Sequence, residues 1–377
     1  MAIPTFTLEI AFATSNPLTA SPTYTDVSTY LMEATWVRGR QRELDRCEAG
    51  TATFVLDGYD WNLLPGYASS AYYPNVLPGK FIRLSATLGG TTTRLFTGYI
   101  DHIEVHWDQP GYSTVTITAT DALALLNLLP IQGPFSQQTT GPRISALLTS
   151  AKWPSANTNI AAGVRTCPVI TYVLTDNMTA GTAINQTADT EPGTFYADGS
   201  GVLQFFTGFQ SGGSVGTIGD GATEVQLDAA TLTVPDDIVY NDIRVTRTGG
   251  TGEQQVTDSG SITEFSRRIL TKSTYNVSDA DAVTTGGSYL TRYKYPAQLF
   301  DPVTFQPVDD NAPGSPFTLA LACEIGKTVT IARTPPAALS LPRFSQSCVI
   351  NHMEHHVTAG TGSEWTTTLR VTGASLH

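Results

Sequence analysis

Histidines concentrate in two short stretches of the chain, and their spacing is the first feature that could support chemistry. Five of the six histidines in the 377-residue sequence are His102 and His106 in one stretch, and His352, His355 and His356 in the other. In a β-strand, residues two and four positions apart share one face. Each stretch would therefore present a His-x-Glu-x-His triplet on one side of a strand, and imidazole and carboxylate groups are common metal ligands.

The glutamates at the centre of the triplets are Glu104 and Glu354. Ligand atoms lie about 2 Å from a bound metal, whereas same-face neighbours on a strand are ~6.5–7 Å apart, so a straight strand needs a bend or a further ligand. His102, His106, His352 and His356 are thus weak metal candidates. We expect polar side chains on an exposed or lumen-facing strand face, with no metal and no cofactor.

The cysteines show no pattern of a metal or redox site. Cys47, Cys167, Cys323 and Cys348 are far apart in the sequence, without a Cys-x-x-Cys pair or a close histidine. A zinc cluster or a redox dithiol would require closer spacing. We therefore expect four buried, reduced thiols.

Signatures of nucleophilic, metalloprotease and nucleotide-binding enzymes are missing from the sequence. Gly326-Lys327-Thr328 is similar to the end of a phosphate loop, but no glycine stands five residues before Gly326 and a strand pattern follows where a helix is required. A glycosidase carboxylate pair has no fixed spacing, so the scattered acidic residues leave that alternative open. We expect a protein without catalytic residues.

The composition indicates a mainly β protein with few charges. The formal net charge is −12 and charged residues make up 14% of the chain, where about 25% is usual. Nucleic-acid wrapping needs clustered Lys and Arg, so this balance argues against it, and it also disfavours anionic membranes. The start lacks a signal-peptide pattern and no run of 18 apolar residues occurs, so neither secretion nor a membrane span is predicted.

Alternating apolar and polar residues predict strands in residues 3–12 and 51–56, and a meander of strands in residues 72–120. Gly89-Gly90 marks a two-residue hairpin turn. From Asp121 the period changes to that of a helix, with Thr120 or Asp121 as N-cap and Pro130 as the stop. Residues 1–130 are therefore expected to form a first β-barrel or sandwich domain with a closing helix.

Three further segments follow. Residues 131–207 are expected to form a small α+β module with a hairpin around residues 198–201, and the glycine-rich residues 208–233 a mobile loop or linker. Residues 234–377 are expected to form a second β-barrel domain with inserted helices. Ser261 with Glu264 predicts a capping box there, and Ser278 precedes a second helix pattern.

One arginine-rich stretch, residues 36–50 (WVRGRQRELDRCEAG), interleaves four arginines with three acidic residues. Charges of both signs at this spacing compensate one another. We therefore expect a self-compensated loop or strand edge and no phosphate site.

The end of the chain repeats the end of the first domain. Residues 99–106 (YIDHIEVH) align without gaps to residues 349–356 (VINHMEHH), with Gly79-Lys80 and Gly326-Lys327 starting a strand upstream of each copy. Downstream, residues 113–122 align to residues 365–374. One β unit thus occurs twice, and three such chains would place six units in a ring with pseudo-sixfold symmetry.

Several pieces of the sequence, in their order along the chain, resemble minor tail proteins of long-tailed bacteriophages, of the baseplate hub or tail-tip type. The resemblance covers nearly the whole chain and rests on RGRQRELDRCEAGTATFVLDGYD, YYPNVLPGKFIRL, LFTGYIDHIEVHW, VTITATDALALL, EPGTFYADGSGVLQF, VYNDIRVTR, RTPP and WTTTLRVTGA.

The resemblance implies a homotrimeric hub of the virion tail tip, assembled in the host cytoplasm from two tail-tube-like β-barrels per chain and a small domain between them. Its implied partners are the distal tail protein ring, the tape-measure protein and the tip or fibre proteins. DNA would pass through the lumen without specific binding, consistent with the acidic, charge-poor composition. The chain ends directly after the second copy, so the C-terminal receptor-binding or wall-degrading extensions of longer relatives are not expected.

Two alternatives remain at this point. A hexameric distal-tail ring protein that presents receptor-binding proteins is one, although a hexamer needs a single barrel per subunit. A cell-surface glycan-binding protein or depolymerase is the other, because aromatic rings can stack on sugars, although such rings are also ordinary core and hairpin residues of a β protein. The candidates for such stacking are Trp36, Trp61, Tyr72, Tyr73 and Trp107.

Overall fold

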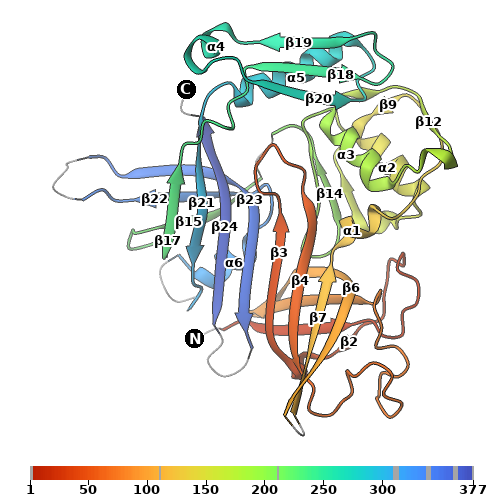
Figure 1. The fold of residues 1–377 in the computed structure, drawn as a ribbon. Coiled ribbons are helices and arrows are strands. Elements are labelled where there is room, and N and C mark those ends of the chain that lie inside the picture. The colour runs from red at the N-terminus through yellow and green to blue at the C-terminus, as the bar shows by residue number, and fades with distance from the viewer. Residues whose placement is uncertain are drawn as a thin grey trace.

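The structure is a computed structural model, and it describes residues 3–109, 112–209, 212–308, 314–336, 341–359 and 364–375. Strands dominate it, as the composition predicts, and one large sheet of 14 strands runs through the molecule (Figure 1). Within these described ranges, no helix is long and apolar enough to cross a membrane.

Eight strands of this sheet lie side by side in one antiparallel row, which we call the wall. The row runs from β17 at one end to β6 at the other (Figure 1). Every neighbouring pair in it is antiparallel. In spatial order the strands are β17 (Ala229–Thr233), β21 (Ala297–Phe305), β24 (Trp365–Ser375), β23 (Phe344–Thr358), β3 (Leu31–Gly39), β4 (Glu48–Asp57), β7 (Tyr112–Thr120) and β6 (Thr91–Gln109).

Shorter strands continue the sheet from the wall and form a second layer. They extend from β6 through β5 (Phe81–Leu88), β1 (Thr5–Ile10) and β2 (Thr25–Asp26), and from β23 through β22 (Thr328–Arg333), β15 (Ser214–Gly219) and β16 (Val225–Gln226). One apolar core joins the two layers. In it, Phe54 of β4 meets Phe96 of β6, and Phe317 of α6 (Pro316–Ala322) lies against Trp365 of β24.

The period-two pattern explains why the wall has one apolar and one polar face. Along β4, Ala52, Phe54 and Leu56 are buried, while Thr51 and Thr53, which alternate with them, are exposed. Successive side chains of a strand point to opposite faces, so one face of the wall packs on the core and the other faces away from it.

The two sequence repeats are paired in the same way. Tyr99 of β6 opposes Thr120 of β7, and Val349 of β23 opposes Thr372 of β24. In both pairs the register shifts two residues later, between Ile100 and His102 in one and between Ile350 and His352 in the other. The internal alignment read from the sequence is thus also the alignment of the hydrogen-bonded strands.

The segments that enter the two repeats match as well. The N–H of Gly79 donates to the Ile100 carbonyl at 2.7 Å, and the N–H of Gly326 donates to the Ile350 carbonyl at 2.9 Å. The amide of Ile100 donates in return to Lys80, and that of Ile350 to Lys327. The two Gly-Lys pairs therefore have equivalent places in the fold.

The described strands form a continuous open wall where the sequence predicted two barrels or sandwiches. The join is made by β3 of the first repeat, which pairs with residues 352–358 of β23 in the second. This is possible because β23 is long: β22 occupies the same edge along residues 344–349 and leaves the rest free for β3.

A small α+β module follows the first repeat. Asp121 is the N-cap of α1 (Ala122–Leu126), because its side chain accepts a hydrogen bond from the N–H of Leu123. Two further helices and short strands pack around a second apolar cluster. These elements are β8 (Gly133–Phe135), β9 (Gln138–Thr139), α2 (Thr140–Ser150), β10 (Thr158–Ile160), β11 (Thr166–Cys167), β12 (Ile170–Tyr172), α3 (Ala180–Asp189), β13 (Thr194–Ala197) and β14 (Leu203–Phe206).

Residues 208–233, expected as a linker, contain β15, β16 and β17. The buried Ile218 and Val225 supply the apolar contacts of β15 and β16. Glycine here serves close packing: a Cβ on Gly219 would lie 2.6 Å from the carbonyl oxygen of Ala332 in the neighbouring β22. The glycine-rich composition thus marks tight strand packing at this place.

Residues 242–293 form a separate layer with its own apolar cluster, where the sequence predicted helices inserted in a second barrel. It consists of β18 (Asp242–Arg247), β19 (Glu253–Thr257), α4 (Ser259–Phe265), β20 (Ile269–Thr274) and α5 (Asp279–Tyr293). The helix predicted after Ser278 is α5, and Ser278 is its N-cap. The predicted capping box at Ser261 is wrong, because Asp258 caps α4 and Ser261 lies inside the helix.

Candidate functional site

The face of the wall turned away from the core is covered mainly by threonine side chains, and we call it the threonine face. Its threonines lie on five of the eight strands, β3, β4, β7, β21 and β24, and strand pairing places several of them opposite one another. The members are Thr35, Thr51, Thr53, Thr114, Thr116, Thr118, Thr120, Thr304, Thr366 and Thr368. Threonine favours strands and exposes a neutral hydroxyl, so the face is polar without being charged.

One cross-strand row shows how the predicted histidines lie on this face. His102 opposes Thr118, Thr118 opposes Thr53, Thr53 opposes Thr35, and Thr35 opposes His356. The Thr35 hydroxyl and Nδ1 of His356 are 2.9 Å apart. At 4.7–4.9 Å per strand, His102 and His356 stand about 19 Å from each other, so they do not form one site.

Within each copy the histidine triplet stays spread along its strand. Nε2 of His102 lies 3.1 Å and Nε2 of His106 3.5 Å from the two oxygens of Glu104, and all three side chains are exposed. His352 is buried, and burial next to Arg370 lowers its pKa. Among the described residues, no three His, Cys, Asp or Glu side chains are grouped as a metal site would require.

His355 points to the core face, and sequence reasoning gave it no role. Its ring stacks on Trp36 with centroids 4.8 Å apart, and the Trp365 indole N–H donates to its Nδ1 at 3.3 Å. The Thr367 hydroxyl is 3.0 Å from the same nitrogen. Burial lowers the pKa of His355 to about 3, so the ring is neutral in the folded protein at pH 7.

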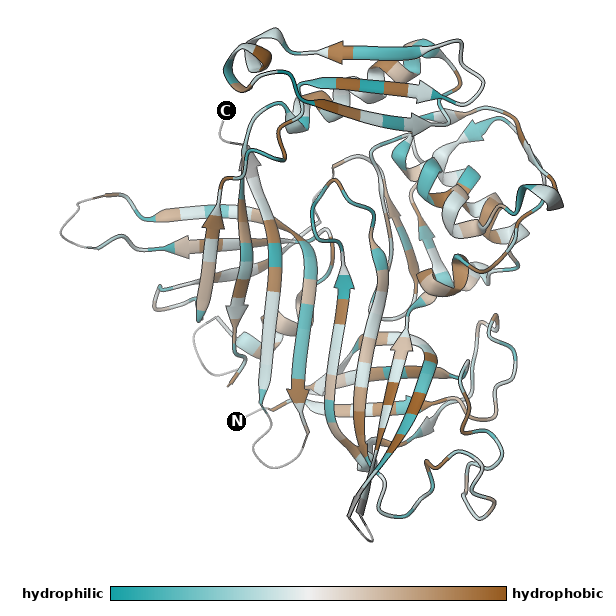
Figure 2. Ribbon diagram, in the orientation of Figure 1, coloured by the Kyte–Doolittle hydropathy of each residue, from teal (hydrophilic) through white to brown (hydrophobic). Residues whose placement is uncertain are grey.

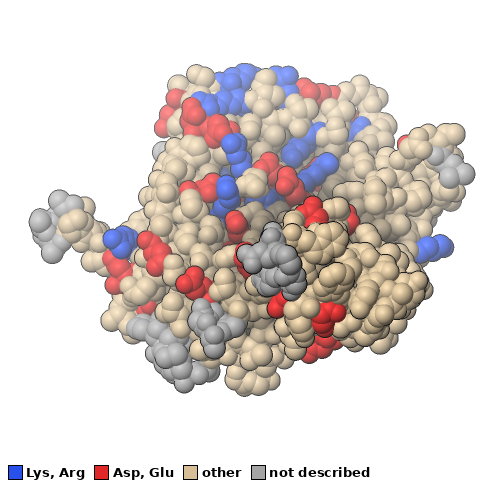
Figure 3. All heavy atoms as spheres, turned by 60° about the horizontal axis from the view of Figure 1, so that its bottom comes forward, with Lys and Arg blue, Asp and Glu red and all other residues tan. Residues whose placement is uncertain are grey.

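Charged groups on the threonine face are few and mostly acidic. Glu33, Glu104 and Glu354 lie on it, and the strand registers assign two arginines to it within the described ranges, Arg370 and, at the β5 end of β6, Arg94, which is paired with Glu9 at 3.2 Å. Arg370 is paired with Asp301 at 3.0 Å. Figure 2 shows brown bands alternating with pale and teal ones along the wall strands, and below the middle of Figure 3 the charged side chains are mostly acidic.

The prediction that the charges of the arginine-rich stretch compensate one another is wrong, because they pair with other parts of the chain. Arg292 of α5 binds both oxygens of Glu43, at 2.7 and 2.9 Å. Arg46 pairs with Asp189 of α3 at 2.5 Å, and Arg42 with Asp237. The β3–β4 loop thereby connects the wall to both smaller modules.

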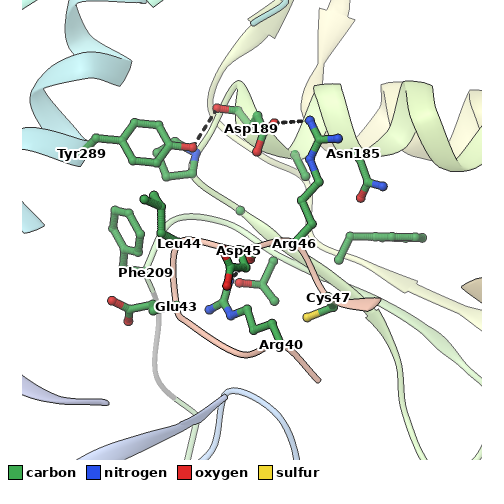
Figure 4. A pocket seen from close by; sticks show the side chains of 15 residues that line it. Arg40, Glu43, Leu44, Asp45, Arg46, Cys47, Asn185, Asp189, Phe209 and Tyr289 are labelled. Atoms are coloured by element: carbon green, nitrogen blue, oxygen red, sulfur yellow. Dashed lines mark hydrogen bonds and ion pairs between the residues drawn. The ribbon is translucent and has the colours of Figure 1, made fainter. Parts of the chain in front are cut away.

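Figure 4 shows this junction around a small pocket of about 30 Å³. Asp189 accepts a hydrogen bond from Arg46 with its carboxylate and from the Tyr289 hydroxyl with its backbone carbonyl, at 3.3 Å. The Cys47 side chain also lines the pocket, and burial raises the pKa of its thiol to about 11. The pocket is thus a packing junction with an unreactive thiol.

All four cysteines are free, as the spacing predicts. Cys167, Cys323 and Cys348 are buried and Cys47 is half-buried. Burial raises the pKa of each of the three buried thiols, to about 11 for Cys167 and about 12 for the other two. Thiols held in the protonated form are poor nucleophiles and metal ligands.

A buried ion pair fixes the join between the two repeats. Arg38 of β3 binds Glu324 with two hydrogen bonds, of 2.8 and 3.1 Å, and only 4% of the Arg38 side chain is exposed. The same guanidinium donates to the carbonyl of Ala197 at 3.3 Å. The pair therefore ties the first repeat, the α+β module and the second repeat together.

Comparison with known proteins finds similarity in structure. No family model matches the sequence, and no curated protein matches it. A tail protein from Neisseria meningitidis MC58 superposes with a TM-score of 0.61 at 12% identity, covering 97% of this chain and 96% of that one. The prophage MuSo2 tail protein from Shewanella oneidensis gives 0.60 at 14% identity, covering 98% and 96%.

A third structure is a component of the type VI secretion system of E. coli, described as similar to the T4 phage tail proteins gp27 and gp5. It gives a TM-score of 0.50 at 10% identity and covers 90% of this chain and 73% of its own. The chain thus has, over nearly its whole length, the fold of phage tail proteins, as the sequence resemblance implied.

Proposed function

We propose that the chain is a structural subunit of a phage tail tip: a homotrimeric hub that joins the sixfold tail tube and distal tail ring to threefold tip proteins. The observation that carries this proposal is the wall, which consists of two equivalent four-stranded halves in one chain. Three chains would supply six equivalent halves facing a sixfold ring and three unlike surfaces facing a threefold partner.

The threonine face is the proposed lining of the hub's channel. Its hydroxyl groups are neutral, its carboxylates repel phosphate, and its arginines Arg370 and Arg94 are already paired with Asp301 and Glu9. Counterion release by Lys and Arg is the main source of non-specific DNA affinity, so such a lining would let DNA slide without sticking. The role is structural, with the distal tail ring, the tape-measure protein and the tip or fibre proteins as proposed partners and the virion tail tip as the proposed location.

Absolute mass by light scattering, measured over a wide range of concentrations, tests the proposal. A species three times the 40.3 kDa chain supports the trimeric hub. A hexamer would instead favour the distal-tail ring, which presents receptor-binding proteins. A protein that stays monomeric and binds a polysaccharide array would favour the glycan-binding alternative.

A further inference from the structure

Two strand edges, one at each end of the wall, have no strand partner among the described residues. One is the outer edge of β17, whose five residues are all exposed. The other is β6 beyond Ile100, where residues 101–107 are exposed or half-buried. Free edges present unpaired N–H and C=O groups to any other strand, and proteins usually cover them.

The repeat indicates what belongs on the free part of β6. Within the first repeat, β5 pairs with residues 91–99 of β6, just as β22 pairs with residues 344–349 of β23 in the second. On β23 the remaining stretch of this edge, residues 352–358, is covered by β3. The equivalent stretch of β6 lacks this strand.

The equivalent of β3 in the second half of the wall is β17. β3 pairs with β4, which pairs with β7, and β17 pairs with β21, which pairs with β24. Followed through these registers, residues 33–37 of β3 correspond without a gap to residues 229–233 of β17. The strand missing from β6 is therefore present at the far end of the same chain, where only a second copy can use it.

We propose that β17 of one copy pairs antiparallel with residues 104–107 of β6 in the next copy, so that the walls of neighbouring subunits join into a closed ring. The inference rests on the proposed homotrimer and specifies its interface. The register follows from the pairing of β23 with β3. Val105 would oppose Leu232 of the neighbouring copy, and His106 would oppose its Thr231.

The side chains at these positions fit this pairing. Trp107 is 65% exposed and Leu232 47% exposed. Their equivalents at the join within the chain, Val357 and Trp36, are 0% and 1% exposed. Pairing would bury both apolar groups on the core side, which stabilises association by roughly 25 cal/mol per Å² of apolar surface removed from water.

The polar side of the proposed contact between subunits also has an equivalent within the chain, at the join of β3 with β23. At the internal join the Thr35 hydroxyl contacts Nδ1 of His356 at 2.9 Å. The equivalent contact between subunits is the Thr231 hydroxyl with the His106 ring. In the isolated chain the His106 side chain is 47% exposed, so a strand of a neighbouring copy can reach it.

Cysteine cross-linking tests the register directly. The variant H106C/T231C places two thiols opposite one another, where paired strands bring Cα atoms to about 4.5–5.5 Å, within disulfide range. We expect mild oxidation to give reducible dimers and closed trimers in high yield. The matched control is H106C/T233C, whose second thiol lies on the same face two residues further along, about 8 Å away, and should give at least tenfold less product.

The single variants H106C and T231C measure background from the native cysteines. If light scattering showed trimers but H106C/T231C did not cross-link preferentially, this interface would be overturned while the proposed trimeric hub would stand. Preferential cross-linking of H106C/T233C would likewise overturn the register. A protein that stays monomeric at every concentration and gives no cross-link would contradict the interface and the trimer together.

Discussion

At the scale of single residues, the join between the two repeats depends on buried polar groups. His355 is neutral and enclosed by Trp36, Trp365 and Thr367, and Arg38 is paired with Glu324. Both residues lie on the two strands that connect the repeats, β23 and β3. Protonation of His355 would bury an uncompensated charge close to the Arg38 guanidinium, so the join should be sensitive to acid.

The variant H355Q tests this sensitivity. The pKa of His355 is about 3 in the folded protein and near 6.5 in the unfolded chain, so the unfolded state binds the additional proton first as pH falls. This contribution to stability is present above pH 6.5 and is lost towards pH 3, with about 2 kcal/mol lost between pH 7 and pH 5. Urea unfolding at the two pH values should show a smaller loss for H355Q.

The matched control is H102Q, because His102 is exposed on the threonine face and lies outside the proposed subunit interface. Its loss of stability between pH 7 and pH 5 should equal that of the wild type. Burial also lowers the pKa of His352, so both variants should still lose some stability as the pH falls. If H355Q lost as much stability between pH 7 and pH 5 as the wild type, protonation of His355 would not be the cause of the acid sensitivity.

At the scale of elements, the critical contact is the approach of β3 to β23. Gly39 has φ +116°, and a Cβ there would lie 2.2 Å from the carbonyl oxygen of Asn351 and 2.8 Å from Cα of His352. Glycine is therefore required for two reasons, the backbone conformation and the space. The amide of Arg40 donates to the same Asn351 carbonyl at 2.9 Å, which closes the pairing.

The variant G39A should weaken the join between the repeats. The unfavourable φ alone costs about 1–3 kcal/mol, and the backbone clash adds to it. G79A is the control, since Gly79 has φ +79° but nothing within 4 Å of the added Cβ, so it carries the conformational cost alone. Thermal unfolding should place G39A clearly below G79A, and equal melting temperatures would contradict a close contact at Gly39.

Local elements were predictable from the sequence because their signals are local. Gly89-Gly90 does connect β5 and β6, and Ser278 does cap α5. The repeat was readable because residues 99–106 and 349–356 keep the same alternation. The pairing of β3 with β23 could not be predicted, because the paired residues are some 320 positions apart and no pattern in either strand indicates which strand it pairs with.

The same limit applies to the candidate site. Sequence alternation identified the polar side of individual strands, including His102 and His356, but only the order of the strands shows that these sides form one threonine face. The ion pairs of Arg38 and Glu43 were missed because their partners, Glu324 and Arg292, lie far along the chain.

At the scale of the whole molecule, the proposed hub requires a channel lining that does not hold DNA. Thr53 is exposed on the threonine face, so T53K would place three new positive charges in the proposed channel. Assembled wild type should retain no DNA at low salt, whereas the T53K ring should retain it and release it as salt rises, with a slope of roughly 0.9 per phosphate contact.

A lysine on the outer layer is the control for charge alone. Thr246 is exposed on β18, outside the wall, so T246K adds the same charge away from the threonine face. Equal DNA retention by T53K and T246K would show that the threonine face does not line the path of the DNA.

The most direct test of the central claim is an electron microscopy reconstruction of the assembled protein, computed without imposed symmetry. We predict a threefold ring whose inner wall is continuous and consists of 24 strands, eight from each of three subunits, with the two halves alternating in a pseudo-sixfold arrangement. A ring of six subunits, or a threefold assembly in which the wall strands of neighbouring copies do not meet, would contradict it.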